Sequence, residues 1–332
     1  MTTRRQLLAA AIASPLTAPL AASLAAPALA QGAWPNRPVR IINPYAPGGT
    51  SDLIIRPLTE RLERAFGRPF VVENKPGAGG TVATAEAARA TADGHTLLIS
   101  NTGPLAVAPS LFRNLAYDPQ RAFSWVSLLG GAPIVCAVKG DSPLNTLADY
   151  KAMAAQAPET VSFGSSGVGS VGHLTGVMWA MEAGVQMLHV PFRGAAEAQQ
   201  NVLGGNTTSL WDTSGANAPA IRAGTLKALA VSSPERVSAL PEVPTLVQGG
   251  FPGSVSTNWF VMAAPAGLDP AIAAKLNTEL QAGLADAAIK TRLESIGVVS
   301  LGDLSAARIG EFVAAEAARW APVVRAAGVQ PS

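Results

Sequence analysis

Cysteine and histidine are scarce in this sequence, which has one cysteine and three histidines among 332 residues. A single cysteine excludes a disulfide within the chain. We expect Cys136 to be a buried strand residue, because it lies in the apolar run "PIVCAV". His95, His173 and His189 are too scattered to form a close metal-ligand pair, so the sequence predicts no metal. His173 and His189 are interpreted as structural hydrogen-bonding residues.

The amino terminus carries a long run without charge. Residues 1–30 have a basic start and then no charged residue up to the small-residue pattern Ala28-Leu29-Ala30, which is typical of a cleaved secretory signal. The stretch "TRRQLL" resembles a twin-arginine export signal, and an ordinary secretory signal is the alternative. A retained membrane anchor is disfavoured, because the run contains three prolines and many alanines. We predict export to a bacterial periplasm and cleavage after Ala30.

Neither sign of charge dominates. The chain has 24 Lys and Arg residues against 22 Asp and Glu residues, and residues 1–30 contain Arg4 and Arg5 but no acid. The predicted mature chain, of about 300 residues, is therefore formally neutral. Nothing in this balance indicates nucleic acid or an anionic membrane as a partner.

Strand-like and helix-like runs alternate along the rest of the chain. "PVRIINPYAP" reads as a strand, and "SDLIIRPLTERLERAF" reads as a helix with an apolar stripe. We expect a kink or a late start at Pro57, which lacks a backbone donor. One long helix is expected from Asp269 to about Ile296, and a last helix from about Ser305 to Ala327, with a break at Pro322 as the alternative. This alternation predicts an α/β fold with largely parallel sheets.

Two segments couple an extended run to glycine and are expected to pass between two lobes. They are "VSLLGGAP" and "GGFPGSVSTNWF". Two such crossings, near Leu129 and Ser256, make the first lobe discontinuous. The predicted division is 31–130 plus 250–332 for lobe 1 and 131–249 for lobe 2.

Three glycine loops share one design, in which a strand is followed by glycines, a hydroxyl residue and a helix. They span Asn43–Asp52, Asn74–Ala83 and Gly164–His173. Helix N-termini leave backbone N–H groups unpaired and carry about half a positive charge. Glycine lets a ligand approach that backbone closely. Three such loops predict a small anionic ligand held between the lobes, bound without lysine or arginine.

The third loop contains Gly167-Val168-Gly169-Ser170-Val171-Gly172, a match to the dinucleotide-binding pattern. That pattern needs an acid about 20 positions on, at the end of the next strand. Here the strand "MLHVPFRG" ends without one, and Arg193 leaves open only a contact with an NADP phosphate. A nucleophile elbow is absent at both Ser166 and Ser170. The sequence therefore predicts no nicotinamide cofactor and no hydrolytic triad.

The segments together resemble the Bug-type solute receptors of tripartite tricarboxylate transporters. The resemblance covers nearly the whole mature chain and is carried, in order, by "WPNRPVRIINPYAPGGTSD", "GRPFVVENKPGAGGTVA", "SFGSSGVGSVGHLTG", "HVPFRGAAEAQQNVLGG" and "FVMAAPAGLDP". It implies a two-lobed periplasmic-binding-protein (Venus flytrap) fold that closes on a small organic acid. It also implies a monomer that delivers this ligand to a membrane permease, with no enzymatic activity and no cofactor.

The resemblance also implies ligand contacts at loops of both lobes. The positions that match are Tyr45, Pro47, Gly48, Gly49, Thr50, Asp52, Thr81, Asn101, Thr102, Ser165, Ser166, Gly169, Ser170, Arg193 and Asp212.

One departure from the family concerns ligand class. The family usually has an acid where this chain has Thr208, and its absence favours plain carboxylates or amides over amino acids. Trp211 is interpreted as a core residue, with a place in the pocket wall as the alternative. Two other functions stay open: an exported enzyme of the same architecture, and a receptor that signals to a membrane partner.

Overall fold

The computed structural model describes residues 34–158 and 160–328, so the predicted export signal lies outside the described residues. The strands are β1 Val39–Asn43, β2 Phe70–Asn74, β3 Thr96–Asn101, β4 Phe123–Lys139, β5 Ser162–Ser165, β6 Leu188–Pro191, β7 Ser209–Thr213, β8 Leu226–Val231 and β9 Thr257–Pro265. The helices are α1 Thr50–Phe66, α2 Thr81–Ala88, α3 Ala108–Leu111, α4 Leu147–Gln156, α5 Val171–Ala183, α6 Ala195–Leu203, α7 Ser214–Arg222, α8 Pro270–Ala285, α9 Ala287–Ser295 and α10 Ala306–Ala326. Short helical turns occur at η1 Ala78–Gly80, η2 Gly103–Val107 and η3 Pro252–Ser254.

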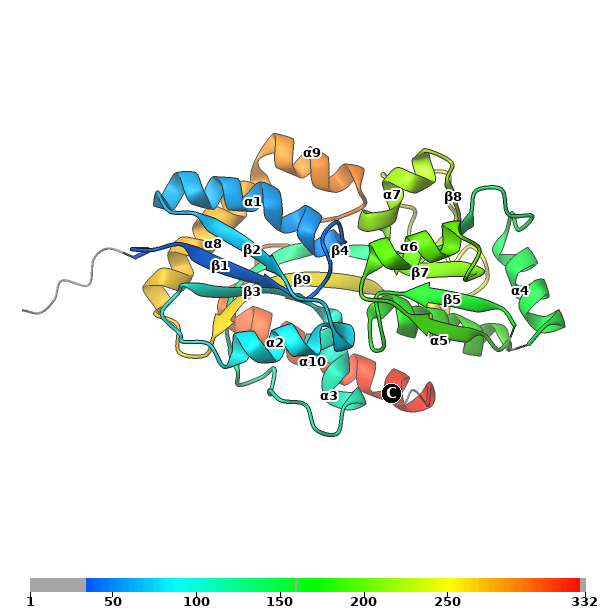
Figure 1. The fold of residues 1–332 in the computed structure, drawn as a ribbon, viewed down its shortest axis with the longest axis horizontal. Helices are drawn as coiled ribbons and strands as arrows, with labels where there is room; N and C mark the ends of the chain where they lie inside the picture. Colours follow the sequence, from blue (N-terminus) through cyan, green and yellow to red (C-terminus); the bar gives the residue numbers. More distant parts are fainter. Residues whose placement is uncertain (1–33, 159, 329–332) are drawn as a thin grey trace, which may run out of the picture. The chain divides into compact units, whose positions relative to one another are not determined.

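The strands form one sheet path in the order β2-β1-β3-β9-β4-β7-β5-β6, with β8 also paired to β4. The pairs among β1, β2 and β3 are parallel, as are those among β5, β6 and β7. The long strand β4 pairs antiparallel with β9 as far as Pro133, and with β7 and β8 from Ile134 onward. Figure 1 shows β1–β3 with α1, α2 and α8 at one end of this sheet, and β5–β8 with α4–α7 at the other. We call these ends the first half (β1–β3 and β9) and the second half (β5–β8).

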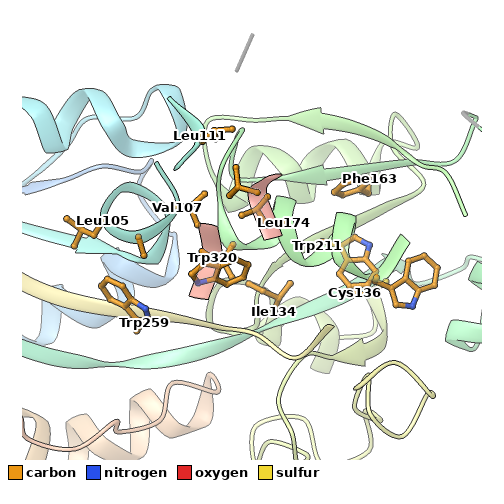
Figure 2. Packing of buried hydrophobic residues seen from close by; sticks show 14 of the residues in the cluster. Leu105, Val107, Leu111, Ile134, Cys136, Phe163, Leu174, Trp211, Trp259 and Trp320 are labelled. Atoms are coloured by element: carbon orange, nitrogen blue, oxygen red, sulfur yellow. The ribbon is translucent and has the colours of Figure 1, made fainter. Parts of the chain in front are cut away.

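An apolar cluster on one face of the sheet joins the two halves. It contains Leu128, Ile134 and Cys136 of β4, together with Trp211 of β7 and Trp320 of α10. In Figure 2 the Trp259, Trp320, Ile134 and Trp211 side chains follow one another across the junction. On the opposite face the halves have separate clusters, to which alternate residues of β4 contribute. The shared cluster explains why the described residues form one compact unit from Trp34 onward.

The structure excludes one expectation at Pro57 and corrects another further along the chain. Helix α1 begins at Thr50 and continues through Pro57, so it has no late start, and a kink at Pro57 stays a prediction. Burial of the Ile54, Leu58 and Leu62 stripe offsets the one backbone hydrogen bond that this proline removes. The helix expected from Asp269 to Ile296 is two helices, because Asp286 has an extended backbone and its side chain accepts bonds from the first turn of α9.

The prediction for the last helix is confirmed in its bounds: α10 begins after its N-cap Ser305, and it is not broken at Pro322. Within the described ranges, no helix is long and apolar enough to cross a membrane.

Candidate functional site

The three glycine loops follow β1, β2 and β5, and loops of the two halves touch. A Cβ atom on Gly79 would lie 2.2 Å from the Val168 carbonyl oxygen, and one on Gly167 would lie 3.4 Å from the Gly79 Cα. Gly79 also has φ +60°, a left-handed conformation that favours glycine. Position 79 must lack a side chain for this approach, which closes the gap between the halves at this point.

Between the loops lies a deep cavity of about 30 Å³, which is room for one or two water molecules. It is lined by residues of both halves: Tyr45, Gly49, Thr50, Ser51, Asn101, Ser166, Ser170, Val171, Gly172, Ala195, Asp212, Thr213, Asn258 and Phe260. None of these is a lysine, arginine or histidine. Hydroxyl groups, amides and one carboxylate therefore set its chemistry.

Four helices begin at the wall of the deep cavity. The first residues of α1, α5 and α6 line it, as does Thr213, the N-cap of α7. The two halves contribute α1 on one side and α5, α6 and α7 on the other. The N-termini of these helices direct unpaired N–H groups and partial positive charge at the same small volume, which suits an anion.

Asp212 is the acid in this wall. It lies at the end of β7 and is only 5% exposed. Its carboxylate accepts hydrogen bonds from the Ser166 hydroxyl and from the Thr213 backbone N–H at 2.6 Å. No described cation lies within ion-pairing distance of it. Burial raises the pKa of Asp212 above its ordinary value, and the hydrogen bonds from Ser166 and Thr213 oppose that rise only in part.

Two further hydrogen bonds organise the same cavity. The Thr50 and Thr213 hydroxyl groups lie 2.6 Å apart and join α1 of the first half to β7 of the second. The Tyr45 hydroxyl donates to the Asn101 side-chain oxygen at 3.1 Å. Burial raises the pKa of Tyr45, so its phenol stays protonated and remains a donor at neutral pH. The wall is therefore held by side chains that hydrogen-bond to one another.

An outer cavity of about 230 Å³ adjoins the deep one, and Tyr45 and Ser166 line both. Its other lining residues are Pro44, Gly77, Ala78, Gly79, Gly80, Phe112, Gly167, Val168, Pro191, Phe192 and Arg193. Rings and glycine backbone make up most of this wall. Arg193 is exposed, and its guanidinium has no hydrogen-bond or ion-pair partner among the described residues.

Eight of the fifteen predicted contact residues line one of the two cavities. They are Tyr45, Gly49, Thr50, Asn101, Ser166, Ser170, Arg193 and Asp212. The other seven, Pro47, Gly48, Asp52, Thr81, Thr102, Ser165 and Gly169, lie outside both linings.

Some of these seven brace the loops instead. Asp52 pairs with Arg56 at 2.7 Å and accepts the Gly48 backbone N–H at 3.1 Å, so it holds the first loop in place. The Thr102 hydroxyl accepts the Trp259 backbone N–H at 3.0 Å. Ser165 hydrogen-bonds to His189 at 2.7 Å beneath the third loop.

Sequence reasoning missed several residues of the site. Ser51, Thr213, Asn258 and Phe260 line the deep cavity, and Phe112 and Phe192 line the outer one. Asn258 is buried, and its side-chain oxygen has no hydrogen-bond partner among the residues that the structure describes. The signal available in the sequence was a polar residue at the start of the otherwise apolar strand "NWFVMAAP". No local pattern connects that strand with the glycine loops.

The two histidines lie beside the third loop, and their predicted role as structural hydrogen-bonding residues is confirmed. Their rings stack with centroids 3.6 Å apart. His173 accepts the Gly169 backbone N–H at 3.2 Å, and its own backbone N–H donates to Ser170, the N-cap of α5. Burial lowers the pKa of His173 to about 4, so the ring is neutral at physiological pH and can accept that bond.

Packing accounts for the dinucleotide-like glycines. A Cβ atom on Gly172 would lie 2.0 Å from the Trp211 carbonyl oxygen, and one on Gly169 would lie 2.6 Å from the Leu111 side chain. Trp211 is 1% exposed in the shared apolar cluster, which confirms its interpretation as a core residue.

Thr208 lies outside both cavity linings, so the ligand preference inferred from it stays a prediction. Thr208 precedes β7, at the opposite end of that strand from Asp212, and its hydroxyl accepts the Ser162 backbone N–H at 3.3 Å. Asp212 is the acid that lines the deep cavity.

Comparison with known proteins gives a consistent result. The family model described as tripartite tricarboxylate transporter family receptor matches residues 54–329. Protein BugT of Bordetella pertussis is 34% identical over 301 residues, which is 90% of this chain and 91% of BugT.

Solved structures agree. MatC of Rhodopseudomonas palustris with bound malate is 31% identical, with a TM-score of 0.83 over 87% of this chain and 99% of MatC. The R. palustris protein Rpa4515 with adipate is 32% identical, with a TM-score of 0.86 over 90% of this chain and 100% of that one. The two-lobed binding-protein fold, the meeting glycine loops and these matches lead to one conclusion: the chain belongs to the receptors of the tripartite tricarboxylate transporter family, and it is a periplasmic solute-binding protein rather than an enzyme.

Proposed function

We propose that this receptor captures a small organic carboxylate between its two lobes and delivers it to a membrane permease. The observation that carries the proposal is the convergence of four helix N-termini and several hydroxyl groups on a cavity without a basic side chain. Such a wall binds an anion through backbone N–H groups and helix dipoles. The relatives with malate and adipate bound support a carboxylate in particular.

In this proposal lobe 1 consists of residues 31–130 plus 250–332, and lobe 2 consists of residues 131–249. The switch of β4 from β9 to β7 and β8, between Pro133 and Ile134, supports a junction close to the first boundary. Contacts such as the Thr50–Thr213 hydrogen bond span the two lobes and form only when they are close together. A carboxylate that touches both lobes therefore binds the closed arrangement better and shifts the population toward it.

The proposal includes the route to the periplasm. Residues 1–30 act as an export signal, of the twin-arginine type, that is cleaved after Ala30, and the mature protein is a monomer. Mass spectrometry of the protein from the periplasmic fraction should give an amino terminus at Gln31, and size-exclusion chromatography with light scattering should give the mass of one chain. Full-length chain retained in the membrane fraction would contradict the cleavage.

The direct test of ligand class is thermal unfolding against a panel of carboxylates. Malate, adipate, short monocarboxylates and aromatic acids are compared with the corresponding amides. A ligand at one hundred times its Kd stabilises a protein by about 2.7 kcal/mol, which raises Tm by roughly 5 °C. We expect at least one acid to give such a shift and its neutral amide to give none. A panel in which only neutral compounds shift Tm would refute an anion site.

A further inference from the structure

The observation that the proposed function leaves unexplained is an acid inside an anion site. Asp212 lies in the wall of the deep cavity, among the helix N-termini that favour a bound anion. A carboxylate ligand and an ionised Asp212 would place two like charges close together in a volume shielded from water. Like charges at short range in a buried site are unfavourable, and one of them takes up a proton when the groups permit it.

The groups around Asp212 do not neutralise it by other means. Tyr45, from the loop after β1, is the titratable group that shares the lining with it, and its phenol is neutral. The first two turns of the neighbouring helices carry Asp52 and Arg56 on α1, His173 on α5 and Glu197 on α6. Asp52 and Arg56 pair with each other, and none of the four forms a hydrogen bond or ion pair with Asp212.

Ser166 connects Asp212 to the place where a ligand would lie, because it lines both cavities. Its hydroxyl donates to the Asp212 carboxylate, so its single proton points away from the ligand. If Asp212 were protonated, the carboxyl O–H would donate to Ser166 instead. The Ser166 proton would then be free to donate to a carboxylate in the outer cavity. One proton on Asp212 thus reverses the direction of the bond and turns Ser166 into a ligand donor.

We propose that Asp212 takes up one proton when a carboxylate binds, so that the receptor binds its anion together with a proton and binds it more tightly as pH falls. This inference rests on the proposed function, and it makes Asp212 and Ser166 a coupled pair that selects the ligand. Proton uptake is coupled to ligand binding at pH values above the ordinary pKa of an aspartic acid, because burial already raises the pKa of Asp212 in the free protein. A bound anion raises this pKa further, and the proton is taken up at pH values between the pKa of Asp212 in the free protein and its pKa in the complex.

The test is calorimetric titration of the mature protein with adipate above about pH 7, where a free carboxylic acid is fully ionised. The binding enthalpies measured in phosphate and in Tris at the same pH differ by the number of protons exchanged, multiplied by the difference between the ionisation enthalpies of the two buffers. We expect an uptake approaching one proton per ligand. We also expect affinity to fall by up to tenfold per pH unit over the range where uptake is complete.

Asp212→Asn is the decisive variant. Its oxygen can still accept the Thr213 N–H, while its NH₂ group donates permanently to Ser166, as the protonated acid would. We expect no proton uptake, no dependence of affinity on pH, and binding at pH 8 at least as tight as that of the wild type. Glu182→Gln is the matched control, since the Glu182 carboxylate accepts hydrogen bonds from Gly253 and Ser254 outside both linings. It should keep the uptake of the wild type.

The outcomes separate the two ideas. Adipate binding without proton uptake, or loss of binding in Asp212→Asn, overturns the inference and leaves the carboxylate receptor standing. Failure of every carboxylate in the panel overturns both.

Thermal unfolding without ligand provides a second readout: an acid whose folded-state pKa is raised destabilises the fold as pH rises through that value. Asp212→Asn should therefore have a higher Tm than the wild type at pH 8 and not at pH 4, and equal Tm values at pH 8 would also overturn the inference.

Discussion

The deep and outer cavities share Tyr45 and Ser166 but are built from different groups. The deep cavity is walled by the first turns of helices, by buried hydroxyl groups and by Asp212. The outer cavity is walled by proline and phenylalanine rings and by glycine backbone, with the exposed Arg193 at its edge. Hydrogen bonds between side chains hold the wall of the deep cavity, whereas most residues that line the outer cavity belong to loops and turns. We therefore expect changes to the deep wall to affect every ligand, and changes to the outer wall to affect some ligands more than others.

The largest loss of affinity should come from a change that prevents the two glycine loops from meeting. Gly79→Ala places a Cβ atom 2.2 Å from the Val168 carbonyl oxygen, a backbone atom that cannot move aside without opening the contact. Overpacking of this kind costs about 1–3 kcal/mol, and the left-handed backbone at Gly79 adds strain, so affinity for adipate should fall about a hundredfold. Small-angle scattering should show that saturating ligand shrinks the wild type but not the variant.

Gly184→Ala is the control for that experiment. Gly184 has φ +68° but nothing within 4 Å of its Cβ position. Gly184→Ala therefore has the same backbone strain as Gly79→Ala but no steric clash. Equal affinities for Gly79→Ala and Gly184→Ala would show that contact between the loops is not needed for binding.

The next effect should come from the hydroxyl groups of the deep wall. Thr50→Ala removes the hydrogen bond to Thr213 that joins the halves, and Ser166→Ala removes the donor between the cavities. A hydrogen bond from either hydroxyl group to the carboxylate of the ligand would be worth about 1.5–3 kcal/mol. Each change should therefore weaken carboxylate binding roughly tenfold to a hundredfold in calorimetry. Thr59→Ala, on the same helix but bonded to the Arg56 carbonyl, should leave affinity unchanged. If neither deep variant differs from Thr59→Ala, the ligand binds elsewhere.

A smaller and ligand-dependent effect is expected in the outer cavity. Phe192→Ala removes a half-buried ring from its wall. Burying an aromatic ring contributes about 1.5–3 kcal/mol when complete, so partial contact should be worth roughly tenfold for adipate or an aromatic acid. A short acid that does not reach the ring should lose less than about twofold. Uniform loss across the panel would contradict the division of roles between the two cavities.

The smallest effect should come from Arg193→Gln. Exposed ion pairs contribute about 0.2–1 kcal/mol, so affinity for a dicarboxylate should fall less than about fivefold. The difference should disappear at high salt, since screening removes what the exposed charge adds. Arg113→Gln, at another exposed arginine outside both linings, is the control. A large, salt-independent loss in Arg193→Gln would mean that this side chain becomes buried against the ligand.

Much of the fold was readable from local pattern. The apolar stripe of α1, the pair Asp269-Pro270 that begins α8 and the cap Ser305 of α10 are set by residues a few positions apart. The glycine loops could be recognised in the same way, and with them the backbone N–H groups of the site. Local pattern missed the break at Asp286, where a side-chain cap decided the outcome, and it left open a late start at Pro57 that the continuous helix α1 excludes.

The sequence by itself determined the order of the elements, the glycine loops at helix starts and, through family resemblance, eight of the residues that line the cavities. Only the tertiary structure decided which of those residues meet. Asn258, Phe112 and Phe192 enter the site from separate strands and loops. Asp52 was predicted at the site but is turned to Arg56, while Asp212 faces the cavity. The physical reason is that a binding wall is defined by side-chain direction and by contacts between distant segments, and neither is encoded in the spacing of residues along one strand or helix.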